Sequence, residues 1–181
     1  MFSTKGVTDN GGKYIPYGIH NVEITGVTSK EAEGSASASV FIEFREKDGT
    51  KTLSERLPFS DKATVYSLRK IKHITTKVVT EAEIDAATAN VKSVGEMAKV
   101  LNKILTGKSL TVKFNGKEVA GSNGKSNWYK AQLGFPPFAE TIGTNPSTLK
   151  FDALKDIKRL DGSASSAPAQ QIKQNSDPLP F

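Results

Sequence analysis

Runs of alternating apolar and polar residues fill the first third of the chain, and a period of two is typical of β-strands. Residues 19–27 and 39–46 both alternate in this way, and residues 51–57 alternate again after a turn signal at Asp48-Gly49. We therefore expect three strands before residue 60, with the second and third joined as a hairpin. The positions assigned to their inner faces are His20, Val22, Ile24, Val40, Ile42, Phe44, Leu53, Glu55 and Leu57.

After residue 60 the apolar residues recur every three or four positions, which indicates helices. Thr80–Glu83 and Ser93–Glu96 each match a capping box, the pattern that begins a helix, and Gly107 suits the position just past a helix end. We expect a helical stretch over about residues 61–107. The buried side of its first helix is predicted to hold Val65, Leu68, Ile71, Ile74 and Val78.

Alternation returns in the last third of the chain and predicts further strands. Residues 110–114 alternate, Asn115-Gly116 is a tight-turn signal, and residues 127–133 alternate again, with Trp128 and Lys130 on the polar side. The spacing of later apolar residues predicts a short final helix over about residues 147–160. Its apolar positions are Phe151, Leu154, Ile157 and Leu160.

Five strands with helices between the third and fourth match the plan of an OB-fold barrel. The expected fold class is therefore mainly β, a five-stranded OB barrel with an enlarged helical insertion. We expect residues 1–17 to form an irregular N-terminal arm, residues 18–160 the OB domain, and residues 161–181 a tail. From Gly162 onward the tail consists mainly of small and polar residues, so we expect it to be disordered.

Charge and composition narrow the classes of function. The 181 residues carry a formal net charge of +6 at pH 7, and the pI is about 9.4, which favours a polyanionic partner. The absence of cysteine excludes disulfides and thiolate metal sites. No apolar run approaches the roughly 20 residues of a membrane span, and no secretory signal begins the chain. We expect a cytoplasmic protein with no membrane contact.

Residues suited to catalysis are scarce. His20 and His73 are the only histidines, and neither belongs to a nucleophile or metal-ligand motif. Residues 121–126 look superficially like a phosphate-binding loop, but their glycines are too close together and a strand follows. We therefore expect no enzyme activity, no cofactor and no metal.

The polar sides of the strands carry the features that single-stranded nucleic acid requires, namely aromatic rings for stacking and cations for phosphates. Phe41 shares its side with Glu43 and Arg45, and Trp128 shares its side with Lys130. Either these rings stack on bases or the inserted helices cover them. The residues predicted to bind single-stranded DNA are Phe41, Arg45, Lys51, Arg56, Lys113, Lys125, Trp128 and Lys130.

The chain ends abruptly in five residues unlike the rest of the tail: Asp177, Pro178, Leu179, Pro180 and Phe181. With the flexible spacer and the basic OB-like body, they make the chain resemble a bacteriophage single-stranded-DNA-binding protein. The end itself is similar to the C-terminal tip of bacterial-type single-stranded-DNA-binding proteins. Such tips dock into basic, apolar pockets on replication and repair proteins, although they usually carry several carboxylates where this one has Asp177 alone.

The resemblance implies a protein that binds single-stranded DNA without strong sequence preference during phage DNA replication, recombination or repair. It would act in the host bacterial cytoplasm and recruit partner proteins through residues 177–181. Two alternatives stay open: a structural or assembly protein of a virion, and an RNA-binding OB protein. The oligomeric state, the site size and the identity of the tail's partner are also left open by the sequence.

Overall fold

The computed structural model describes residues 13–121 and 127–160. Lys125 and the tip residues 177–181 therefore lie outside the described residues. The strands are β1 (Gly18–Lys30), β2 (Ala38–Glu46), β3 (Thr52–Phe59), β4 (Ser109–Val119), β5 (Trp128–Leu133), β6 (Ala139–Thr141) and β7 (Ile157–Lys158). The helices are α1 (Thr64–Thr75), α2 (Glu81–Thr88), α3 (Val94–Leu105) and α4 (Ala153–Asp156).

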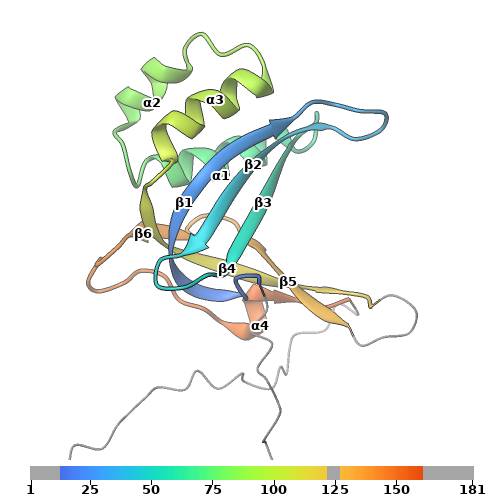
Figure 1. Ribbon diagram of the computed structural model, residues 1–181. Coiled ribbons are helices and arrows are strands. Elements are labelled where there is room, and N and C mark those ends of the chain that lie inside the picture. The colour runs from blue at the N-terminus through green and yellow to red at the C-terminus, as the bar shows by residue number, and fades with distance from the viewer. Residues whose placement is uncertain (1–12, 122–126, 161–181) are drawn as a thin grey trace, which may run out of the picture.

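The strands form one seven-stranded sheet in the order β3-β2-β1-β4-β5, and β6 and β7 also pair with β4. All ladders are antiparallel except the short one between β4 and β7. In Figure 1 the long, bent β1 rises from the level of β4 and β5 toward α2 and α3. The protein is therefore mainly β, as the sequence predicts, with α1, α2 and α3 inserted between β3 and β4.

The core lies between the apolar sides of the strands and the inserted helices. Val22, Val40 and Phe44 are fully buried in one cluster with Ile74 of α1 and Leu101 of α3. The helices therefore cover the inner side of β1 and β2. The sequence leaves open which side of these strands the helices cover. Phe41 lies on the other side of β2 and is not part of this cluster.

Side-chain caps fix the residues at which α2 and α3 begin. Thr80 and Glu83 form the full capping box, in which the Thr80 hydroxyl accepts a hydrogen bond from the Glu83 N–H while the Glu83 carboxylate binds the Thr80 N–H. At α3 only half of the predicted box forms: Ser93 accepts from the Glu96 N–H, but the Glu96 carboxylate binds the Lys92 N–H at 2.7 Å. Among the described residues no helix is both long and apolar enough to cross a membrane.

The predicted turn at Asn115-Gly116 is wrong, because β4 runs straight through it. Gly116 is needed there for a close approach: a Cβ atom at this position would lie 3.1 Å from the ring of Tyr17. Tyr17 in turn stacks on Phe151 and meets Tyr129 edge-on. The glycine therefore makes room for an aromatic cluster beneath the end of β4.

The predicted apolar side of α1 is only half right. Ile71 and Ile74 are buried, whereas Val65 and Leu68 are exposed. The inward position in the first half of α1 belongs to Ser67, whose hydroxyl donates to the Pro58 carbonyl at 2.6 Å. That end of α1 is thus attached to β3 by a hydrogen bond instead of apolar packing.

The predicted final helix over residues 147–160 is also wrong, since α4 has only four residues. Ile157 and Lys158 leave the helix and pair with Gly116 and Lys117 of β4. The pairing of β1 with β4 begins at Phe114, so the residues of β4 after Phe114 are not paired with β1. Ile157 and Lys158 pair with β4 in this part of the strand. An available strand edge therefore outweighs the helical spacing of the apolar residues.

Candidate functional site

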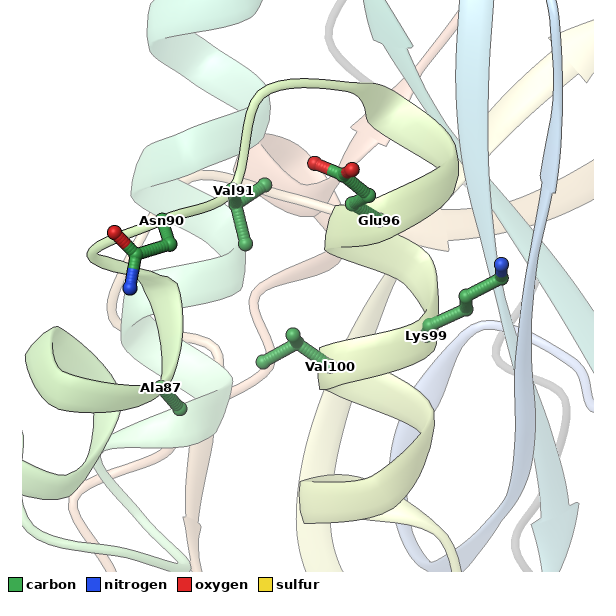
Figure 2. A pocket seen from close by; sticks show the side chains of 6 residues that line it. All are labelled: Ala87, Asn90, Val91, Glu96, Lys99 and Val100. Carbon is green, nitrogen blue, oxygen red and sulfur yellow. The ribbon is translucent and has the colours of Figure 1, made fainter.

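One cleft in the described structure offers little to a catalytic mechanism. It is a shallow, open hollow of about 280 Å³ between α2 and α3, lined by Ala87, Asn90, Val91, Glu96, Lys99 and Val100. The gap is mainly apolar, and Figure 2 shows the Lys99 side chain extending away from it. The Glu96 carboxylate is already bound to the Lys92 N–H.

Both histidines have structural partners. The Nε2 atom of His73 accepts hydrogen bonds from the backbone N–H groups of Phe138 and Ala139, at 3.1 and 3.2 Å. Burial, with a contribution from Lys77, lowers the pKa of His73, in keeping with an unprotonated acceptor. The Nδ1 atom of His20 lies 3.3 Å from the Glu46 carboxylate. Each ring therefore connects two parts of the chain.

The predicted DNA contacts on β2 and β3 lie on the outward side of the sheet. Phe41 is half-buried and sits opposite Arg56 in the ladder. The Arg56 guanidinium donates a hydrogen bond to the Ser39 hydroxyl at 2.9 Å. Because Ser39 and Phe41 are both on β2, this bond holds the guanidinium beside the strand that carries Phe41. Phe41 and Arg56 thus form one small group with an aromatic ring and a cation.

The rest of that outward side is balanced in charge. Arg45 forms an exposed ion pair with Glu23 at 2.9 Å, and Glu43 accepts a hydrogen bond from Ser54 at 2.6 Å. Lys51 lies in the turn between β2 and β3, partly covered. Because carboxylates alternate with cations here, this surface attracts a polyanion weakly.

Lys113 is not available in the way the sequence suggests. Its ammonium group forms an ion pair with Asp156 of α4 at 3.0 Å, and both side chains are largely buried. A lysine that is already paired and desolvated gains little from a phosphate. Lys113 therefore holds α4 on β4 in this structure.

Three exposed lysines lie side by side across β5, β4 and β7. Lys130 and Lys158 are the direct ladder partners of Lys117, one on each side of it. We call Lys117, Lys130 and Lys158 the lysine row. Direct ladder partners project from the same face of a sheet, so the three ammonium groups share one surface. None of them has an ion pair among residues 13–121 and 127–160.

Trp128 stands beside the lysine row. It begins β5 two residues before Lys130, so both side chains point to the same face of the sheet. Its exposed fraction is 51%, and its ladder partner is Val119. The prediction that Trp128 and Lys130 share the polar side of their strand is confirmed by the burial of the alternate residues Ala131 and Leu133.

Lys117 and Lys158 are not among the eight residues predicted to bind DNA, although Lys117 belongs to the group of lysines around the later strands. Lys117 follows Lys113 on the outward side of β4, a signal that was hidden by the expected turn at Gly116. Lys158 falls within the expected final helix, so its place beside Lys117 had no signal in the sequence. The predicted contacts therefore separate into a Phe41–Arg56 group and a Trp128–Lys130 group, and the second is the more basic.

No family model matches this chain, and no curated protein matches its sequence.

Proposed function

We propose that this protein binds single-stranded DNA without strong sequence preference, through the surface formed by Trp128 and the lysine row. Stacking on the exposed indole would hold a base, and the three ammonium groups would follow the phosphates. These are the two components that sequence-independent single-strand binding requires. Phe41 and Arg56 would form a secondary contact on the outward side of β2 and β3.

The carrying observation is the alignment of Lys117 with a lysine on each side. Like charges directly opposite in a ladder are destabilising, so this arrangement costs the free protein stability. No carboxylate in the described residues pairs with any of the three. A bound phosphate backbone would neutralise the repulsion, and its release of counterions would favour binding.

The strand order supports an OB-type barrel as the framework. β1 pairs with both β2 and β4, β4 pairs with β5, and the helices fall between β3 and β4. An OB fold is a partly open barrel with this helix position, and its strand faces and the loops after its first and fourth strands bind oligonucleotides. Trp128 directly follows the loop between β4 and β5.

The C-terminal tip supports a role in DNA replication or recombination in a phage-infected cell. Residues 177–181 lie outside the described residues, so this part rests on their sequence alone. The aromatic ring of Phe181 suits an apolar pocket, while Pro178 and Pro180 reduce the entropy lost on docking. We propose that the tip recruits replication or recombination proteins to the coated strand.

A titration of labelled oligo-dT followed by fluorescence anisotropy tests the proposal, with a duplex of equal length as the comparison. Preferential binding of the single strand, weakening as salt rises, is the expected result. Equal affinity for duplex and single strand, or no binding at low salt, would exclude it and favour a structural or virion assembly role. Tighter binding of oligo-U than of oligo-dT would instead indicate an RNA-binding protein.

A further inference from the structure

Two exposed aromatic rings meet at the opposite end of β5 from Trp128. Tyr66 of α1 and Phe135, two residues after β5, contact each other edge-on with ring centroids 5.8 Å apart. Their exposed fractions are 50% and 70%. Exposed apolar side chains that gather together mark a binding surface more often than isolated ones do.

The two rings are held on a well-anchored part of the structure. Lys70, one turn after Tyr66, donates a hydrogen bond to the Leu133 carbonyl at 2.7 Å. One further turn along, His73 accepts from the N–H groups of Phe138 and Ala139. Both ends of the segment that carries Phe135 are therefore attached to the same side of α1 as Tyr66.

One ring of this pair, Phe135, lies on the same continuous segment as Trp128 and Lys130. Phe135 follows Trp128 by seven residues, which corresponds to roughly 20 Å along an extended strand. Lys130 lies between them and is close enough to act electrostatically on Glu55, which binds Lys70. The segment from Trp128 to Phe135 thus carries an aromatic, a basic and again an aromatic side chain, and the last of these contacts Tyr66.

The charge beside the rings selects the class of partner. Arg69 lies three residues after Tyr66, on a neighbouring part of the helix surface, and is exposed. It forms no ion pair within the part of the chain that the structure describes. An exposed ring pair with an unpaired guanidinium fits a base and its phosphate, since arginine binds phosphate well and aromatic faces stack on bases.

We propose that Tyr66 and Phe135 form a second base-stacking platform, so that a single strand runs along β5 from Trp128, past Lys130 of the lysine row, to α1. This inference rests on the proposed function and assigns a second contact point to the same DNA path. It requires a minimum length of DNA: an oligonucleotide of about 4 nucleotides would occupy one platform, and one of about 12 would reach both.

The experiment compares oligo-dT of about 4 and about 12 nucleotides on the full chain, with the double variant Y66A/F135A. Trp128 is the single tryptophan, so quenching of its fluorescence reports DNA at the first platform without a label. The double variant should bind the longer strand roughly five- to a hundredfold more weakly, the range expected for one lost stacked base. It should bind the shorter strand as the wild type does, with the same quenching at saturation.

The control variant is Leu154→Ala, which removes another exposed apolar side chain from α4. It should leave both affinities unchanged, and equal thermal midpoints would show that all variants are folded.

If wild type binds the longer strand but Y66A/F135A binds it equally well, the second platform is excluded while the proposed function stands. If wild type binds neither strand, the proposed function itself fails. If the double variant is destabilised, Tyr66→Leu with Phe135→Leu keeps the apolar contact and removes only the flat rings.

Discussion

Glu55 of β3 and Lys70 of α1 together join the two strands at the ends of the sheet's order, β3 and β5. One carboxylate oxygen of Glu55 accepts from the Leu133 N–H at 3.1 Å, and the other lies 3.1 Å from the Lys70 ammonium group. Lys70 also donates to the Leu133 carbonyl at 2.7 Å. A buried ion pair therefore serves both backbone groups of Leu133, in a place where β3 and β5 have no ladder between them.

Removing Lys70 should destabilise the protein in a pH-dependent way. Burial raises the pKa of Glu55, and Lys70 is the main charge that opposes this rise. In Lys70→Met the carboxylate is left buried without its partner, and we expect a loss of about 3 kcal/mol at neutral pH. When the pKa of a carboxyl group is higher in the folded than in the unfolded protein, the protein loses stability as pH rises above the unfolded pKa. The loss caused by Lys70→Met should therefore be smaller at pH 5. Urea unfolding at the two pH values measures it.

The matched control is the double variant E55Q/K70M, in which a neutral amide still accepts the Leu133 N–H. Both variants lack the Lys70 bond to the Leu133 carbonyl, so their difference isolates the unpaired charge. We expect the double variant to be more stable than Lys70→Met at pH 7 and to show a weaker dependence on pH. Equal pH dependence in the two would contradict the assignment of the effect to Glu55.

His73 should make the protein sensitive to mild acid. Its Nε2 accepts two backbone N–H groups, and its pKa is lowered by burial from the ordinary value of 6.5. The unfolded chain therefore takes up a proton at higher pH than the folded one, so stability falls as pH drops below 6.5 and levels off below the folded pKa. Thermal midpoints between pH 8 and pH 5 measure the decline.

The variant His73→Gln separates this effect from other titrating groups. A glutamine oxygen can accept a hydrogen bond at any of these pH values, and His20 remains in both proteins. We expect the midpoint of the variant to fall less between pH 7.5 and pH 5 than that of the wild type. Parallel pH profiles for the two proteins would show that His73 does not control the acid response.

The strands and inserted helices were predictable because their signals are local. Alternation places Val40, Ile42 and Phe44 on one side of β2 in the sequence itself, and the capping residues of α2 are three positions apart. The bridge between Glu55 and Leu133 joins residues 78 positions apart, and no local pattern reports it. The alternation of β3 groups Glu55 with Leu53 and Leu57 but gives it no partner.

The candidate site was predictable to the same extent. Trp128 and Lys130 follow from the alternation of β5, but the lysine row depends on which strands become neighbours. Lys158 reaches Lys117 because β1 leaves part of the β4 edge free, which is a property of the assembled sheet. Likewise, the pairing of Lys113 with Asp156 depends on where α4 docks, so the sequence could not distinguish it from a free cation.

Trp128 should act in binding and not in folding. Because its side chain is half exposed at the start of β5, replacing it with alanine should leave the thermal midpoint nearly unchanged. The same change should weaken oligo-dT binding by roughly five- to a hundredfold, since one stacked base is lost. Trp128→Phe, which keeps a smaller ring, should retain part of the affinity. A large drop in the midpoint with unaltered binding would identify Trp128 as a structural residue.

The lysine row predicts that stability and binding change in opposite directions. Lys117→Gln removes the central charge, so repulsion with Lys130 and Lys158 disappears and the thermal midpoint at low salt should rise by about 1–3 °C. The same variant should bind oligo-dT more weakly, and the slope of log affinity against log salt should become shallower by about 0.7.

Lys99→Gln, an equal change of charge at an exposed position on α3, is the control and should alter neither quantity appreciably. If Lys117→Gln lowers the midpoint and leaves the salt slope intact, the row is neither strained nor in contact with phosphates. The rise in stability should also vanish at high salt, because screening removes the repulsion between exposed charges.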